Sequence, residues 1–141
     1  MPVILDTGHL TILQRQVPEA DRLLGRLDQL APDDIATTIV SFQEQVQGWL
    51  AYLNRARRDN ELLRAYAELD KIRRSFQKMN VLPFAEVALD CFKSLRKRCR
   101  RVGTLDLRIA SIALTTEAEL LTGNLRDFRQ VPGLVAEDWA V

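Results

Sequence analysis

Four acidic residues follow apolar segments of the sequence and could share one chemical task. Asp6 ends the first apolar run, "VIL", and Glu44 lies in the segment after "IATT". Asp106 begins an apolar helical pattern, and Asp127 lies shortly after "ELLTGN". Grouped carboxylates repel one another unless a cation neutralises them, and oxygen donors without histidine or thiolate suit Mg²⁺ or Mn²⁺. One or two such ions could make a hydroxide nucleophile for an in-line displacement.

Each acid also has a purely structural explanation. Aspartate is a preferred helix N-cap, which would account for Asp6. Glu44 completes a capping-box pattern with Ser41, and Thr104 could cap the helix that contains Asp106. For any one acid taken alone, capping is the better explanation, so only the four together favour a site.

The elements that would position these acids follow from the hydrophobic pattern. Short strands are expected at 3–5, 35–38, 80–84, 119–124 and 134–139. Helices are expected at 7–16, 18–30, 42–53, 54–79, 85–101, 105–118 and 125–130, with a break near residues 59–60. Strands that alternate with helices predict an α/β fold of three layers, in which helices flank a central parallel sheet of four to five strands. The working site of such a sheet lies outside the carboxyl ends of its strands, where the four acids would meet.

Composition sets wider limits. A chain of 141 residues, 47% hydrophobic and 28% charged, fits one globular domain over residues 1–141. A net charge of +1 neither demands nor excludes a nucleic-acid partner. Cys91 and Cys99 would lie roughly 12 Å apart on one helix, too far to bridge, which predicts reduced thiols and a cytoplasmic protein. No apolar run is long enough to predict a membrane span.

Some other residues could have either a functional role or an ordinary structural one. The basic clusters "NRARR" and "RKRCRR" are expected to be solvated helix faces, but they could follow a phosphate backbone through Arg55, Arg57, Arg58, Arg96, Lys97 and Arg98. His9 lies about one helical turn after Asp6 and could reach the mouth of the crevice, although a surface or packing role is expected for it. Trp49 is expected in the core, because it lies on an apolar stripe, and Trp139 could cover a sheet edge.

Four segments together resemble the PIN domains, in particular the VapC-type ribonucleases of bacterial toxin–antitoxin pairs. They are "VILDTGHL", "TTIVSFQEQVQG", "GTLDLRIASIAL" and "LLTGNLRDFRQVPGLVAEDW". The last is the most specific, with its Thr-x-Asn-x-x-Asp-Phe core followed by Val-Pro-Gly-Leu and a terminal Trp. The resemblance spans the chain from end to end, although residues 54–79 match only as helix.

The resemblance implies a role for each site residue. Asp6, Glu44, Asp106 and Asp127 fall on the acidic positions that hold Mg²⁺ or Mn²⁺ in the family. Thr7 and Thr122 fall on hydroxyl positions beside the metal, and Asn124 falls on the asparagine of the last motif. The family hydrolyses RNA with a metal-activated water and leaves a 3′-hydroxyl and a 5′-phosphate. Many members are homodimers, and a small antitoxin protein inhibits them by placing its tail in the active groove.

One position departs from the family pattern. Gly8 stands where these proteins usually carry Asn or Asp, so a side chain that could orient Asp6 or a bound water is missing. The sequence predicts a metal-dependent endoribonuclease, the toxin of a type II toxin–antitoxin pair. The main alternative is a catalytically silent PIN-like module that binds RNA or protein, for which Gly8 is the best evidence. A metal-dependent phosphatase is a weaker third reading.

Overall fold

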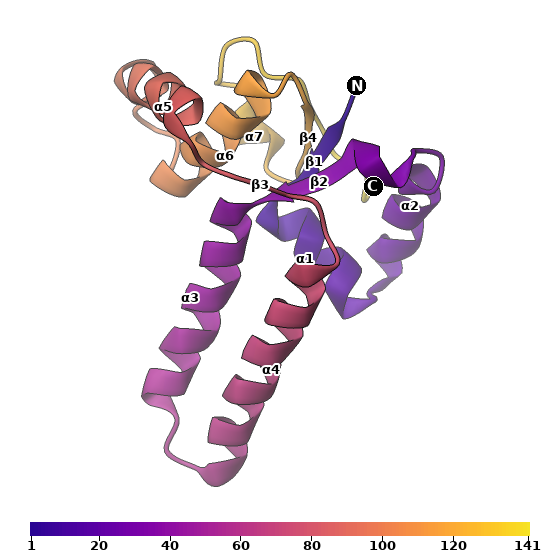
Figure 1. Cartoon of the computed structure of the whole chain (residues 1–141), viewed down its shortest axis with the longest axis vertical. Helices are drawn as coiled ribbons and strands as arrows, with labels where there is room; N and C mark the ends of the chain where they lie inside the picture. The colour runs from indigo at the N-terminus through magenta and orange to yellow at the C-terminus, as the bar shows by residue number, and fades with distance from the viewer.

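The computed structural model describes residues 1–141 and consists of a five-stranded parallel sheet with helices around it (Figure 1). The strands are β1 (Val3–Leu5), β2 (Ile35–Thr38), β3 (Val81–Leu82), β4 (Glu119–Leu121) and β5 (Ala136–Glu137). The helices are α1 (Thr7–Arg15), α2 (Pro18–Leu27), α3 (Ile39–Arg55), α4 (Asp59–Gln77), α5 (Glu86–Arg98), α6 (Thr104–Thr115) and α7 (Leu125–Phe128). A short 3₁₀ helix, Pro32–Asp34, leads into β2. The predicted α/β fold with a parallel sheet is confirmed.

The strand order places β1 at the centre of the sheet. The order is β3-β2-β1-β4-β5, and Ile4 of β1 pairs with Ala36 on one side and with Leu120 on the other. The chain therefore moves from β1 outward to β2 and β3, and then crosses back to β4 on the opposite side of β1. Such a reversal opens a crevice at the carboxyl ends of the two strands that flank it, here β1 and β4.

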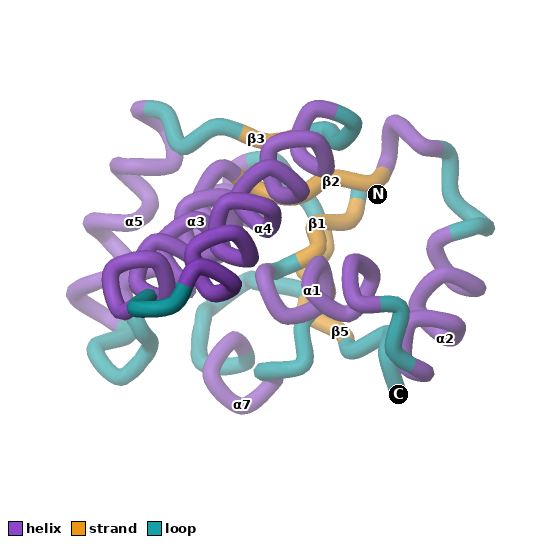
Figure 2. Tube along the Cα trace, turned by 90° about the horizontal axis from the view of Figure 1, so that it is seen from below, coloured by secondary structure: helices purple, strands orange, loops and turns teal.

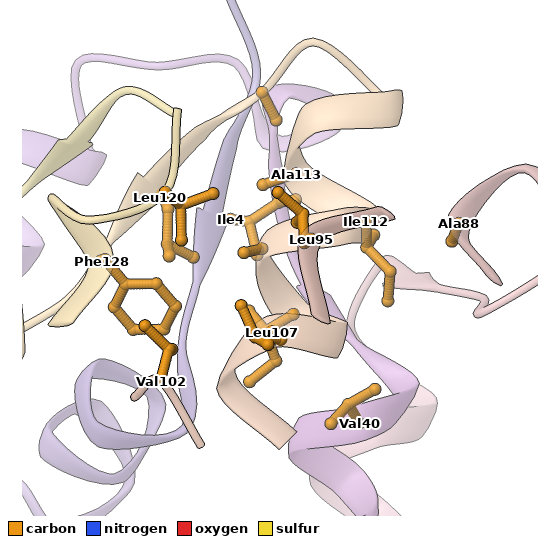
Figure 3. Packing of buried hydrophobic residues seen from close by; sticks show 14 of the residues in the cluster. Ile4, Val40, Ala88, Leu95, Val102, Leu107, Ile112, Ala113, Leu120 and Phe128 are labelled. Carbon is orange, nitrogen blue, oxygen red and sulfur yellow. The ribbon is translucent and has the colours of Figure 1, made fainter. Parts of the chain in front are cut away.

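Alternate residues of β1 enter two separate hydrophobic clusters, because successive side chains of a strand point to opposite faces. Ile4 packs with Leu107 of α6 and Phe128 of α7 in the cluster that α5 and α6 cover (Figure 3). Val3 and Leu5 face the other side, where α1, α2 and the last turns of α4 complete the second cluster. Each fully buried side chain of this size contributes roughly 1.5–3 kcal/mol, so both faces anchor the central strand.

Helices α3 and α4 form an antiparallel arm that extends away from the sheet (Figure 1). Figure 2 looks along this arm and shows α1 on one side of it and α5 on the other. Residues 56–58 join the two helices, slightly before the predicted break. Most of the outer surface of α4 is exposed, and only Ala65, Ile72 and Phe76 are buried, which agrees with a solvated helical arm. None of the helices is both long enough and apolar enough to span a membrane.

Two helices begin earlier than the sequence pattern suggests. β2 runs directly into α3, and the Thr38 hydroxyl caps that helix by accepting a hydrogen bond from the backbone N–H of Ser41 at 3.1 Å. The predicted capping box of Ser41 and Glu44 is therefore wrong, since Glu44 lies in the second turn and its side chain is free for another role. Thr104 is likewise the first residue of α6 rather than its cap.

Candidate active site

The carboxyl edge of the sheet carries a row of polar residues. Asp6, Thr122 and Asp138 directly follow β1, β4 and β5, which are neighbours in the sheet. Glu44 comes to the same edge on α3, which leaves the sheet beside α1 (Figure 1). Asp106 reaches it from the first turn of α6. The topology thus brings residues that are more than a hundred positions apart in the sequence to one place.

Asp6 is a helix cap and a buried acid at once. Its Oδ1 accepts a hydrogen bond of 2.8 Å from the backbone N–H of His9, so the predicted capping role is correct. The side chain is largely withdrawn from water, since the residue is only 8% exposed. Burial raises the pKa of this carboxyl, and the hydrogen bonds from His9 and Thr122 oppose that rise only in part.

Asp106 shows that the four predicted acids form one electrostatic group. Burial raises the pKa of its carboxyl to about 6, and the charges of Glu44, Asp6 and Asp127 add to this rise in that order. A hydrogen bond with Asn124 acts in the opposite direction. The other three predicted acids therefore lie within electrostatic range of Asp106.

Hydroxyl and amide groups fix two of the acids. Thr7 Oγ1 lies 2.7 Å from Glu44 Oε1 and 3.0 Å from Ser41 Oγ. A carboxylate can only accept, so the Thr7 proton goes to Glu44 and the Thr7 oxygen is left to accept from Ser41. Asn124 Nδ2 donates to Asp127 Oδ2 at 3.0 Å. Thr7 therefore restrains Glu44, and Asn124 restrains Asp127.

His9 and Asp138 belong to the same edge. The sequence indicated this place for His9 only as an alternative to packing, and it gave no role to Asp138. His9 is only 1% exposed, and its Nε2 lies 3.2 Å from Asp138 Oδ1 and 3.2 Å from the backbone nitrogen of Trp139. Its Nδ1 lies 3.8 Å from Asp6 Oδ1 and has no hydrogen-bond partner. The expected packing role for His9 is correct in part, but its contacts join Asp6 to the C-terminal segment. Asp138 lies inside the segment expected as the last strand, 134–139, and only the shorter observed strand, which ends at Glu137, places it at the carboxyl edge.

The donor set of this edge fits a hard divalent cation. The acids of this edge offer carboxylate oxygens as ligands. Threonine hydroxyls and an asparagine amide lie next to these carboxylates. As they stand, no three His, Cys, Asp or Glu side chains are close enough together to hold an ion, so binding would require the carboxylates to draw inward. Burial is the main cause of the raised Asp106 pKa, and Mg²⁺ or Mn²⁺ would relieve the repulsion by Glu44, Asp6 and Asp127 that adds to it.

The basic clusters and Trp49 lie outside this group of acids. Arg55 lines a cleft that Glu44 also lines. Arg57 and Arg58 follow α3 at the far end of the arm, roughly 20 Å from Glu44 at the usual helical rise. The side chains of Arg96, Lys97 and Arg98 are exposed at the end of α5, just before the turn into α6. Trp49 is only half-buried: it packs on the second cluster and also lines the cleft, so the expected core position is correct in part.

Comparison with known proteins agrees with this architecture. The sequence matches the PIN domain family over residues 3–134. Ribonuclease VapC1 of Haemophilus influenzae (strain R2866) is 28% identical over 144 aligned residues, which cover 99% of this chain and 98% of the relative. The fold is similar to that in the structure of VapBC-1 from nontypeable Haemophilus influenzae, with a TM-score of 0.77, 24% identity and full coverage of both chains. It is also similar to a toxin–antitoxin complex from Klebsiella pneumoniae, with a TM-score of 0.68, 21% identity and coverage of 94% of this chain and 95% of that one. The chain belongs to the PIN domain family and is related to the VapC ribonuclease toxins.

Proposed function

We propose that this protein is a Mg²⁺- or Mn²⁺-dependent endoribonuclease and acts as the toxin of a type II toxin–antitoxin pair. The observation that carries the proposal is the electrostatic coupling of Asp106 to Glu44, Asp6 and Asp127 at the carboxyl edge of the sheet. A module that only binds has little use for a group of acids that repel one another. The relation to the VapC ribonucleases supports RNA as the substrate.

The residues of this chain would act by holding charge in a fixed geometry. Asp6 is held by the backbone of His9, Glu44 by the hydroxyl of Thr7, and Asp127 by the amide of Asn124. When bound, Mg²⁺ or Mn²⁺ supplies a nucleophilic water and neutralises the charge that develops on the phosphate. These hydrogen bonds orient the three carboxylates, so that once they have drawn inward on an ion, little further reorganisation would accompany the reaction.

The partners follow from the same relationship. Several proteins of similar fold were solved as toxin–antitoxin or VapBC complexes, which supports a small antitoxin protein as a partner of this chain. A homodimer is part of the proposal as well, on the family resemblance alone. A short upstream gene that encodes a DNA-binding protein would support the toxin assignment.

Cleavage of a mixed RNA pool by the purified protein with Mn²⁺ tests the enzyme directly. Asp106→Asn is the matched control, because it keeps the size of the side chain and removes one charge from the acid group. We expect the wild type to cut and the variant to lose nearly all activity while it keeps its fold. If the wild type binds RNA but cuts no better than Asp106→Asn, the protein is a silent binding module of the kind that Gly8 suggested.

A further inference from the structure

A large cleft opens beside the acids of the candidate site. Of the residues that line it, only Thr7 and Glu44 have a part in the proposed reaction. The volume of the cleft is about 1030 Å³, and α1, α3 and α4 form its walls. Thr7 and Glu44 line it, so the cleft and the acid group are continuous. The same face of α3 then presents Gly48, Tyr52 and Arg55, four, eight and eleven residues beyond that glutamate. The cleft therefore runs from the acids along the arm.

Positive charge predominates along the cleft. Its lining contains four basic and two acidic side chains: Arg15, Arg55, Arg64, Lys71, Glu44 and Glu68. Lys71 is paired with Glu68 at 3.3 Å, whereas the three arginines form no ion pair within the chain. Unpaired cations in a concave surface attract an anionic chain and favour its entry.

Two aromatic rings lie in the same wall. The ring centroids of Trp49 and Tyr52 are 5.2 Å apart in an edge-to-face arrangement, and both side chains are half-buried. The exposed guanidinium of Arg64 lies over both rings, 5.4 Å from the Trp49 centroid and 5.8 Å from that of Tyr52. Aromatic rings and guanidinium groups are the surfaces on which proteins stack unpaired bases.

We propose that this cleft guides single-stranded RNA to the acid group, with a base stacked on Trp49 or Tyr52 and phosphates beside the unpaired arginines. The inference rests on the proposed ribonuclease function and adds to it the path and the form of the substrate. A single strand is required because the bases of a duplex already stack on one another. RNA fits better than a polypeptide because each of its residues carries a phosphate that could meet the unpaired arginines of the three walls, and because the cleft leads to the acids.

Gly48 offers a way to block the cleft without unfolding the arm. A Cβ atom added there would meet nothing within 4 Å, so the leucine of Gly48→Leu would project into the open cleft. Leucine also has a helix propensity better than that of glycine by roughly 0.8 kcal/mol, so α3 should keep its fold. Gly25 on α2 has equally open surroundings and lies outside the cleft, which makes Gly25→Leu the matched control.

Binding is measured apart from cleavage, on the full chain in an Asp106→Asn background with EDTA. The probe is a fluorescein-labelled, unstructured RNA followed by anisotropy. We expect Gly48→Leu to weaken binding about tenfold or more, a loss of the size that removing one base stack produces, and Gly25→Leu to have no effect. Unlabelled RNA should quench tryptophan fluorescence, and the quench should disappear in Trp49→Phe and with duplex RNA of the same sequence.

Two results would overturn the inference. If Gly48→Leu binds RNA as well as Gly25→Leu does, the strand takes another path and a polypeptide becomes the better occupant of the cleft. If the parent protein binds no RNA, the cleft has no such role. Failure of the nuclease proposal looks different, because it appears as a lack of cleavage with Mn²⁺ and does not affect binding in EDTA.

Discussion

Neighbouring polar groups hold the carboxylates of the candidate site. The Asp6 carboxylate accepts from the backbone of His9 at 2.8 Å, and Glu44 accepts from Thr7 at 2.7 Å. Hydrogen bonds to a charged group are shorter and roughly twice as strong as neutral ones, so each acid is restrained individually. Burial raises the pKa of the Asp106 carboxyl to about 6, and repulsion from Glu44, Asp6 and Asp127 adds to that rise.

The stability of the metal-free protein should fall as the pH rises through about 6. The pKa of Asp106 is about 6 in the fold against an ordinary value of 3.8, so between these values the folded state binds more protons than the unfolded state. Its contribution to stability is fully present below pH 4 and is lost as the pH passes 6. Asp106 is partly open to solvent, so the loss should be only about 1–2 kcal/mol after screening. Urea unfolding in EDTA at pH 5 and pH 7.5 measures it, and Asp106→Asn should show a smaller difference.

Gly8→Asn should be tolerated and should leave activity equal or higher. A Cβ atom at Gly8 would lie 3.5 Å from Asp6 Oδ1, an ordinary contact, and the position is exposed. The asparagine amide could then donate to Asp6 and orient it, as the resemblance implies for this position. Titration with Mn²⁺, followed by thermal melting and by RNA cleavage, measures the effect. A clear loss of activity would mean that the site needs the space that Gly8 leaves.

Elements whose pattern is local could be predicted from the sequence, and contacts between distant segments could not. The runs around Ile4 and Leu120 predicted parallel strands, and the acids after them predicted a site at the carboxyl edge. For Glu44 the sequence left a site role and a capping box open. The structure excludes the capping box, which the sequence could not do because it does not show that β2 enters α3 without a loop. The contact of His9 with Trp139 spans 130 positions and has no periodic signal. Only the fold reveals that a buried histidine ties the two ends of the chain together.

Replacement of His9 should loosen the C-terminal segment. In His9→Leu the backbone N–H of Trp139, which now lies 3.2 Å from His9 Nε2, loses its acceptor inside the protein. A buried donor without a partner costs about 1–3 kcal/mol, so the free energy of unfolding should fall by this amount. His9→Gln can keep an acceptor near the same place and should lose less. Equal stability of both variants in urea would show that the contact contributes little.

At the scale of the whole molecule, the acids of the candidate site and the unpaired arginines of the cleft occupy different places, although other charges form ion pairs. The acids gather at the carboxyl edge, while the unpaired arginines of the cleft and the basic end of α5 lie around it. The net charge of +1 hides this separation, because a sum says nothing about distribution. A metal cation would be attracted to the acids at the carboxyl edge, and an anionic chain would be attracted to the basic side chains.

Mg²⁺ or Mn²⁺ should raise the melting temperature of the protein. An ion that binds only the folded state at a hundred times its Kd stabilises by about 2.7 kcal/mol. Asp6→Asn should reduce this shift, because it removes one of the charges that the ion would neutralise. Calorimetry with and without millimolar-range metal tests this, with Asp70→Asn on the exposed face of α4 as a control outside the acid group. If wild type and Asp6→Asn respond equally, the ion binds elsewhere.

The basic end of α5 should contribute to RNA binding through charge alone. Arg96, Lys97 and Arg98 are exposed and touch none of the acids, so reversing them one at a time to Glu should weaken RNA binding without changing the stabilisation by metal. Each lost phosphate contact should also make the plot of log K against log salt shallower by about 0.7, the value for single strands. Arg22→Glu on α2, far from α5 in Figure 1, changes the net charge equally and serves as the control. An equal loss of affinity in Arg22→Glu would mean that only the total charge matters and that α5 forms no specific contact with the strand.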